Sequence, residues 1–298
     1  MGFFDRLLGR KPAAPAAALD TSEANLRAVF GDDNVMIASG LWLDPVVWSE
    51  RPAPGGDQVG GIPDNIGAEI WPNCPLCSCP MTFIAQIAVE PDREPRYPER
   101  GYLAIFLCNS DPPTSDDVCV TAEGPGSACF FVGEDQRAAT PMFDDDQLRA
   151  IARAHDRVGD RLAGTEYLMP QRPGWNARPV LQHAFRVERR RVLSVRQPDP
   201  PTDAGRRRSR SDPSSEQRYA LWAAACDAAE VAIDIGGFPD WLQSPIELTC
   251  RCGAPMELIL QYDAFDGAIN LGDTGRAYVF ACAQRCSPTA FAARWDCC

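Results

Sequence analysis

A pattern of cysteine, proline and glycine residues occurs twice in this chain, and this duplication constrains the fold more than any single motif. One copy lies near residues 60–108 and the other near residues 236–282. The separations between matching anchors are 176, 175, 175, 175 and 174 residues for Gly61 with Gly237, Cys77 with Cys252, Met81 with Met256, Gln86 with Gln261, and Cys108 with Cys282. Because the separation drifts so little, the spacing predicts an internal repeat.

Hydrophobic patterning places strands within the copies and helices outside them. Residues 81–89 alternate as a half-buried strand does, and residues 102–107 form a continuous apolar run of strand length. Helical signals cover residues 24–30 before the first copy, and residues around 148–162 and 214–231 between the copies. The prediction is a β-rich α+β fold with internally duplicated sheet units, each with a cysteine (zinc) knuckle, and helices between them. Two independent units joined at about residues 197–213 are the alternative architecture.

The boundaries that follow from composition and repeat spacing divide the chain into five segments. They are a disordered leader (1–20), a first repeat unit (21–134), a helix and strand connector (135–196), a flexible linker (197–213) and a second repeat unit (214–298).

The cysteines are numerous and clustered. Of the thirteen, each repeat copy holds six, and only Cys226 stands apart, on an apolar helical segment where the sequence predicts a core position. The amino terminus is too short and too charged for a signal-peptide core, so we expect a cytoplasmic protein. In a reducing compartment, clustered cysteines in odd number favour metal binding over disulfides.

Zinc requires four ligands in a tetrahedron, usually supplied as two close pairs on tight turns. In the second copy the spacing predicts Cys250, Cys252, Cys282 and Cys286 as the ligands. In the first copy Cys74 and Cys77 form one pair, and Cys108 with Cys119 is the preferred second pair. Cys79 and Cys129 compete for the fourth position of that site. The expected cofactor is structural Zn²⁺, as one or two ions.

Charge and composition exclude several classes of function. A net charge of −12 disfavours nucleic acid as a partner, because such binding needs a cationic surface. No run of residues reaches the apolar length of a membrane span. The chain has only two histidines, neither beside a cysteine motif, and it contains no nucleophile elbow, P-loop or dinucleotide-binding fingerprint. These features predict a protein that is not an enzyme.

Two further positions recur or stand out. Gln86 and Gln261 occupy matching strand positions, where we expect the amide to hydrogen-bond backbone within the duplicated fold. Trp241 follows the second glycine-proline turn, where it either anchors a contact with a partner or packs over its own knuckle.

The second copy resembles a known family through three segments. They read Gly-Gly-x-Pro-Asp-Trp-Leu-Gln (236–243), Cys-x-Cys-Gly-x-Pro-Met-x-Leu-x-Leu-Gln (250–261) and Gly-Arg-Ala-Tyr-Val-Phe-x-Cys (275–282). They resemble the bacterial YwqG-like proteins of unknown function, and also the zinc-knuckle segment of programmed cell death protein 2 and its relatives, which act as chaperones for a ribosomal protein. The first copy departs from the pattern at Asn65, which stands where the second has Trp241. The resemblance implies a duplicated β-rich fold with structural zinc and no established catalysis.

Duplicated metal frameworks without catalytic groups predict a zinc-stabilised protein-binding module, such as a dedicated chaperone, an adaptor or a toxin-neutralising partner. One alternative is a thiol-disulfide oxidoreductase that uses Cys74 and Cys77 as a redox dithiol. Such dithiols normally begin a helix, whereas the residues after Cys77 are patterned as a strand. A zinc sensor or storage protein is a further alternative.

Overall fold

The computed structural model describes a little more than half of the chain. The described residues are 19–45, 54–76, 78, 80–89, 100–108, 126–136, 144, 146, 185–198, 213–263, 271 and 275–297. The helix expected around residues 148–162, most of the leader and most of the 197–213 linker lie outside these residues.

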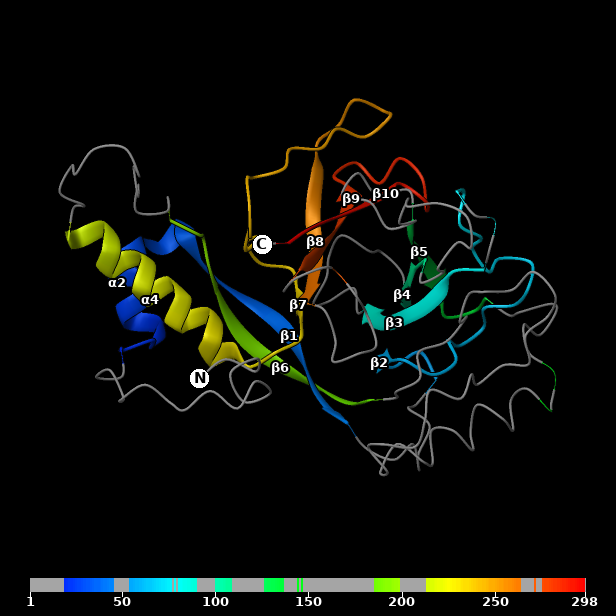
Figure 1. The fold of residues 1–298 in the computed structure, drawn as a ribbon, viewed down its shortest axis with the longest axis horizontal. Coiled ribbons are helices and arrows are strands. Elements are labelled where there is room, and N and C mark those ends of the chain that lie inside the picture. Colours follow the sequence, from blue (N-terminus) through cyan, green and yellow to red (C-terminus); the bar gives the residue numbers. More distant parts are fainter. Residues whose placement is uncertain are drawn as a thin grey trace.

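Two α-helices, one short 3₁₀ helix and ten strands make up the described structure (Figure 1). The helical elements are α2 (Glu23–Phe30), η1 (Asp32–Asn34) and α4 (Pro213–Ala229). The strands of the first half are β1 (Val35–Pro45), β2 (Gln58–Val59), β3 (Thr82–Val89), β4 (Gly101–Leu107) and β5 (Ser127–Gly133). Those of the second half are β6 (Phe185–Val195), β7 (Ile233–Ile235), β8 (Met256–Asp263), β9 (Arg276–Cys282) and β10 (Phe291–Asp296). The fold is therefore β-rich α+β, as the sequence predicts.

All ten strands belong to one antiparallel sheet with the order β10-β9-β8-β7-β1-β6-β2-β3-β4-β5. The sheet curls, so that the edge strands β5 and β10 contact one another and the two halves enclose one hydrophobic core. Leu103 and Ile105 of β4 belong to this core together with Leu260 of β8 and Val279 of β9.

The two halves repeat the same strand pairing. β3 pairs with β4 with a register shift between Phe83 and Ala85, and β8 pairs with β9 with a shift between Leu258 and Leu260. The irregularity falls 175 residues apart in the two halves, which is the spacing of the sequence repeat. The duplication therefore extends from the cysteine pattern to the pleating of the strands.

The two long strands at the centre of the sheet join the halves. β1 pairs with β6 over eleven residues, from Val35 opposite Val195 to Pro45 opposite Phe185. β1 also pairs with β7 of the second half, whereas β6 pairs with β2 of the first half. Each half thus completes its sheet with a strand that comes from the other part of the chain. This arrangement is one continuous sheet and differs from two independent units.

A buried glutamine holds the glycine-proline turn in each half. The Gln86 side-chain oxygen accepts a hydrogen bond from the backbone N–H of Asp64 at 3.0 Å, and the Gln261 oxygen accepts one from Asp240 at 2.9 Å. The glycine pairs that start these turns, Gly60 with Gly61 and Gly236 with Gly237, all have positive φ. Only glycine adopts that conformation without strain, which explains the paired glycines. The predicted role of the amides in backbone hydrogen bonding is confirmed.

An indole covers an equivalent phenylalanine in each half, although the two tryptophans occupy unrelated positions in the repeat. Trp71 meets Phe106 edge-on with ring centroids 5.1 Å apart. Trp241 stacks on Phe280 at 6.2 Å and contacts Tyr278 at 4.8 Å. Trp241 therefore packs on the sheet of its own half. The sequence alone leaves two roles open for this residue, packing over its own knuckle and contact with a partner.

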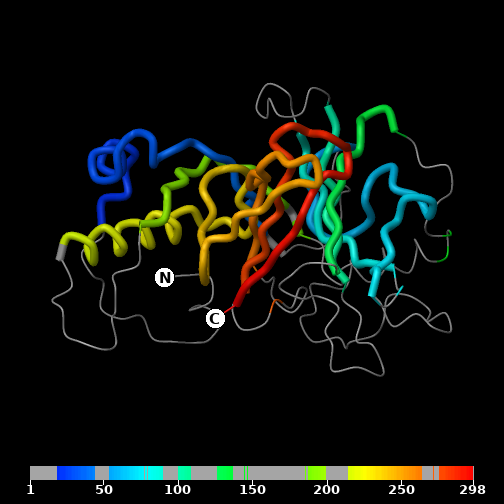
Figure 2. The backbone as a smooth tube through the Cα atoms, turned by 90° about the horizontal axis from the view of Figure 1, so that it is seen from above, coloured from blue at the N-terminus to red at the C-terminus, as the bar shows by residue number. Residues whose placement is uncertain are grey.

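A small helical lobe stands at one end of the sheet (Figures 1 and 2). Its core combines residues of α2 and α4 with the ends of β1 and β6: Leu26, Phe30, Val35, Val195, Leu221, Trp222 and Ala225. Ser22 caps α2 by accepting a hydrogen bond from the N–H of Asn25. None of the helices in the described ranges has both the length and the apolar character needed to cross a bilayer.

The prediction that Cys226 is a core residue is wrong. Its side chain is exposed on α4, whereas its neighbour Ala225 packs into the lobe. The helix turns by about 100° per residue, so adjacent positions face different surroundings. The apolar composition of this helix did not reveal which face is covered.

We predict that replacing the buried glutamine of the first half destabilises the fold. Gln86→Ala removes three hydrogen bonds, to the Asp64 N–H, the Asp64 carboxylate and the Gly56 carbonyl, at a side chain that is 0% exposed. The expected loss in unfolding free energy is about 2–4 kcal/mol, because the turn's polar groups stay buried without partners. Urea denaturation checks this, with the exposed Gln217→Ala on α4 as the matched control. Equal stabilities of the two variants would contradict the role of Gln86 in holding the turn.

Candidate metal centre

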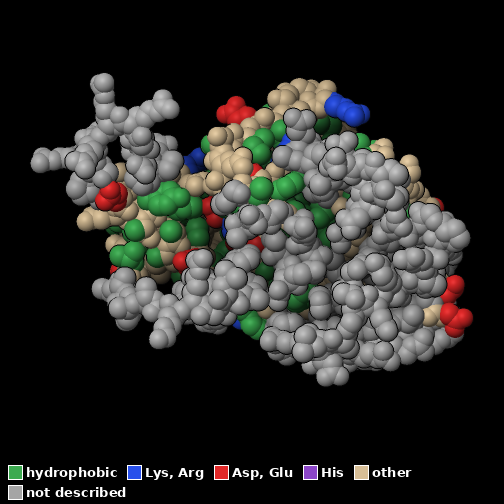
Figure 3. Space-filling model, in the orientation of Figure 1, with side chains coloured by type: hydrophobic (Ala, Val, Ile, Leu, Met, Phe, Trp, Pro, Cys, Tyr) green, Lys and Arg blue, Asp and Glu red, His purple; other side chains and the backbone are tan. Residues whose placement is uncertain are grey.

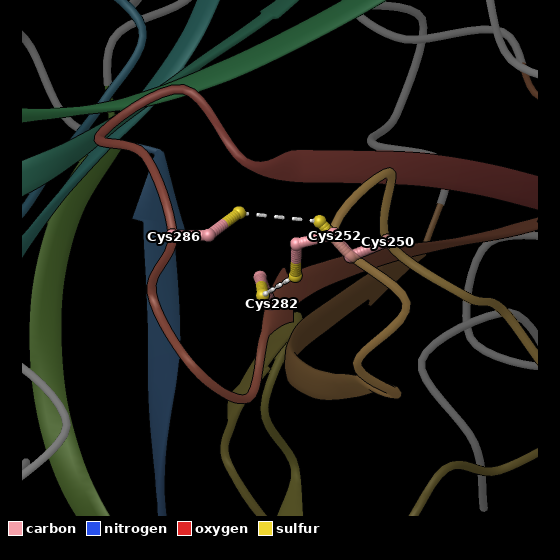
Figure 4. A group of neighbouring side chains, drawn as sticks. All are labelled: Cys250, Cys252, Cys282 and Cys286. Atoms are coloured by element: carbon pink, nitrogen blue, oxygen red, sulfur yellow. Dashed lines mark hydrogen bonds between the residues drawn. The ribbon is translucent and has the colours of Figure 1, made fainter.

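Four cysteine side chains from the second half point toward one another (Figure 4). They are Cys250, Cys252, Cys282 and Cys286, and their sulfur atoms all lie within 4.8 Å of one another. The closest pairs are Cys250 with Cys286 at 3.4 Å and Cys252 with Cys282 at 3.6 Å. These are the four residues that the sequence spacing groups into one site.

Two tight turns of the same design present the four sulfurs. In the first turn the N–H of Gly253 donates to the carbonyl of Cys250 at 2.8 Å, and in the second the N–H of Arg285 donates to the carbonyl of Cys282 at 2.9 Å. Gly253 and Arg285 both have positive φ, which sharpens each turn. Each cysteine pair is thereby held on one side of its turn. This is the knuckle geometry expected of a structural zinc ligand pair.

The strands that carry the knuckles are hydrogen-bonded to each other. Cys250 follows the bridge between Thr249 and Pro255, which leads into β8, and Cys282 ends β9, which pairs with β8 along its length. Beyond the ladder the N–H of Ala283 donates to the carbonyl of Pro255 at 3.0 Å, which joins the two turns. The sheet therefore brings together ligands that are about thirty residues apart in sequence.

The cluster shifts the pKa values of two of its thiols in opposite directions. The pKa of the Cys282 thiol is lowered to about 6, chiefly because the backbone N–H of Cys286 donates to it. The pKa of the Cys286 thiol is raised to about 12, chiefly because this thiol hydrogen-bonds to the side chain of Cys250 and, as the next largest cause, to that of Cys252. Thiolate is the form that binds a metal ion.

The cluster fits a tetrahedral metal ion with sulfur ligands. Zinc–sulfur bonds of about 2.3 Å place the sulfurs of a tetrahedron about 3.8 Å apart, which is close to the two shortest separations. The four cysteines of the cluster form no disulfide. With four sulfur ligands the ion has no open position for water, so such a site is structural rather than catalytic.

In the first half the structure describes two of the four predicted ligands. Cys74 follows the bridge between Asn73 and Pro80, as Cys250 follows the bridge between Thr249 and Pro255. Cys108 directly follows β4, and Cys282 is the last residue of β9. Both side chains are buried, at 1% and 2% exposure. They therefore occupy the positions that supply one sulfur from each knuckle in the second half.

The remaining candidates of the first site divide into two groups. Cys77, Cys79 and Cys119 lie outside the described residues. Cys129, the competing fourth ligand, lies on β5 opposite Ile105 and belongs to the central core. It is close enough to Tyr262 of β8 to influence the pKa of that phenol, which burial chiefly raises. Cys129 thus packs in the core that the two halves share.

Sequence reasoning missed a cluster of charged side chains on the second half. Arg276 binds Asp263 through two hydrogen bonds, at 2.6 and 3.1 Å, and also bonds to Asp240. Asp234 of β7 lies beside them and accepts a hydrogen bond from Gln261 at 3.3 Å. Burial chiefly raises the pKa of Asp234 to about 6, and the neighbouring carboxylates add to the effect against the attraction of Arg276.

The charged cluster is a divergence between the two copies. By strand register, Gln58 stands where the second half has Asp234, Ala88 where it has Asp263, and Tyr102 where it has Arg276. The first-half group is neutral, and the Tyr102 hydroxyl is buried without a hydrogen-bond partner. Aligning the copies beyond their cysteines would have revealed these substitutions.

The chain belongs to the family described as a domain of unknown function, DUF1963, whose model matches residues 57–297. The matched segment contains both cysteine knuckles and both glycine-proline turns. This membership is consistent with the resemblance to the YwqG-like proteins, whereas the resemblance to programmed cell death protein 2 finds no support. No curated protein matches the chain.

We predict that Asp234 makes stability fall as pH rises from about 4 to 6. The folded pKa of about 6 exceeds the unfolded value of 3.8, so in this window the unfolded chain releases the proton first and unfolding is favoured. Asp234→Asn removes this dependence, and above pH 6 it should raise the unfolding free energy by about 1–3 kcal/mol.

Denaturation curves at pH 4.5, 6 and 7.5 check this difference, because these values lie within the window, at its upper end and above it. The exposed Asp227→Asn on α4 is the matched control. If the wild-type chain and Asp234→Asn changed in parallel across the series, Asp234 would not titrate as described.

Proposed function

We propose that the protein is a non-enzymatic, zinc-stabilised protein-binding module of the cytoplasm, which acts as a dedicated chaperone, adaptor or toxin-neutralising partner. The observation that carries the proposal is the convergence of Cys250, Cys252, Cys282 and Cys286. A four-thiolate site closes one end of the β8–β9 pair, and it supplies folding energy instead of a reactive position.

The helical lobe supports a role in binding another protein. Four large apolar side chains are exposed on or beside this lobe, at 37–52% of their surface: Leu19, Val29, Met36 and Ile37. Apolar side chains also gather over the lobe on the face that Figure 3 shows. Exposed apolar side chains of this size are the kind that protein partners cover.

The redox alternative has less support. Cys74, the first cysteine of the dithiol, is 1% exposed and is followed by a turn in which the N–H of Ser78 donates to its carbonyl. A catalytic dithiol presents an accessible thiolate at the start of a helix, which lowers the pKa of the thiol. The zinc sensor or storage alternative draws on the exposure of Cys252 and Cys286, because accessible sulfurs allow a chelator to compete for the ion. A chelator titration separates a structural ion from an exchangeable one.

We predict that Cys250→Ser loses one equivalent of zinc and destabilises the fold by about 4 kcal/mol or more, since metal binding energy at such a site is folding energy. Elemental analysis and thermal unfolding of the purified chain check this. Cys226→Ser is the matched control because Cys226 is exposed on α4 and lies outside the cluster. Loss of zinc from Cys226→Ser with retention in Cys250→Ser would contradict the assignment.

The first site has its own test. We expect Cys74→Ser and Cys77→Ser each to lose one equivalent of zinc, the one bound by the first half, and to retain the ion of the second half. A wild-type chain that binds a single equivalent would restrict the metal to the second half.

We predict that the exposed apolar residues of the lobe are needed for capture of the partner. A tagged wild-type chain should recover one protein in stoichiometric amount from native lysate, and Met36→Ser with Ile37→Ser should recover several-fold less, because truncated apolar contacts lose binding energy. The exposed Asp135→Asn in the first half is the control. Repeated recovery of no stoichiometric protein by the wild-type chain would count against the proposal.

A further inference from the structure

The four cysteines of the metal centre form two pairs that each combine an exposed and a buried sulfur. Cys286 is exposed and lies 3.4 Å from the buried Cys250. Cys252 is exposed and lies 3.6 Å from the buried Cys282. Both pairs join one knuckle to the other, and neither joins two cysteines of the same turn.

We infer that the cluster is an oxidative modification site for peroxides, at which Cys250 bonds to Cys286 and Cys252 to Cys282. The inference rests on the proposed metal centre and adds a chemical reaction to it. Exposed sulfurs that share one site with three others are the sulfurs that a dissolved oxidant meets first.

The reaction proceeds in two balanced steps at each pair. In the zinc-loaded site the sulfurs are thiolates. The exposed thiolate attacks one peroxide oxygen, the O–O bond breaks, and a sulfenic acid and a hydroxide ion form. The buried thiolate then attacks the sulfenic sulfur, the S–O bond breaks, and a disulfide and a second hydroxide ion result. The sulfurs are oxidised and the peroxide is reduced. Once both pairs have reacted, no thiolate remains to hold the zinc ion, which is released.

The backbone around the cluster favours bonds between the knuckles. Cys250 and Cys252 are held on one turn by the hydrogen bond from Gly253 to Cys250, and Cys282 and Cys286 by the bond from Arg285 to Cys282. The two turns are already joined through Ala283 and Pro255. Disulfides between the turns replace the metal bonds without separating β8 from β9. The oxidised chain therefore keeps this hairpin closed after the ion has left.

Trypsin separates the four cysteines of the cluster from one another, and fragmentation of the peptide 219–251, which also carries Cys226, shows whether a crosslink there is at Cys250. Cleavage after Arg251 and Arg285 divides each knuckle, and the four cysteines then lie on separate peptides: residues 219–251, 252–276, 277–285 and 286–294. The inference predicts crosslinks of 219–251 with 286–294 and of 252–276 with 277–285. Pairing within a knuckle would instead link 219–251 with 252–276 and 277–285 with 286–294.

The experiment treats the zinc-loaded full-length chain with hydrogen peroxide, follows released zinc with a chromogenic chelator, blocks remaining thiols and maps the peptides without reduction. We expect one equivalent of zinc from this site together with the two predicted crosslinks, and both changes reversed by a dithiol reductant. Cys226→Ser should release zinc at the wild-type rate, because this exposed thiol lies outside the cluster.

Two outcomes would overturn the inference. One is pairing within the knuckles, and the other is oxidation of Cys226 while the zinc stays bound. The zinc content of the reduced chain, measured beforehand, tests the proposed metal centre separately. A chain without zinc that still forms the two predicted crosslinks would refute the metal centre and retain the pairing.

Discussion

The pairing of β1 with β6 is the interaction on which the rest of the structure depends. These strands are separated by about 150 residues, yet they pair over eleven positions and supply the centre of the sheet. On its other edge β1 pairs with β7 of the second half, and β6 pairs with β2 of the first half. Neither half therefore has a complete sheet without the other. A partly buried ion pair reinforces the junction, because Arg189 of β6 binds Asp57 with its Nε 2.7 Å from the carboxylate and also reaches the carbonyl of Ala88. The closing entropy of this long connection is offset by the core that the two halves share.

Around this centre the two copies share the same backbone features and differ in the side chains beside them. The strand irregularity, the glutamine that holds the turn and the paired glycines all recur. These features concern backbone geometry, where a substitution leaves buried polar groups unpaired or strains φ. The side chains beside them have diverged, since Arg276 and two carboxylates of the second half stand where the first half has neutral residues. The charged cluster is therefore a property of one copy, laid on a frame that both share.

The sequence predicted the parts that short-range chemistry determines. Cysteine pairs at knuckle spacing, a glycine-proline turn and alternating strands have local signatures, so the four sulfurs of the second half and the positions of β3, β4 and α4 follow from them. The exchange of central strands has no local signature, because residues 35–45 and 185–195 become neighbours only when the sheet forms. The surroundings of Cys226 and Cys129 were not predictable for the same reason. Packing against distant parts of the chain determines that Cys226 is exposed on α4 and that Cys129 is buried on β5.

The position of the cysteine cluster links stability to exposure. Its buried sulfurs belong to Cys250, in the turn that leads into β8, and to Cys282, at the end of β9. Its exposed sulfurs, on Cys252 and Cys286, lie at the outer part of each turn, in contact with solvent. A structural ion buried on all sides would be protected from oxidants and chelators, whereas an ion held here is accessible through half of its ligands. Bonds from a metal ion to these four sulfurs would close this end of the sheet, and two of the four would stay open to solvent.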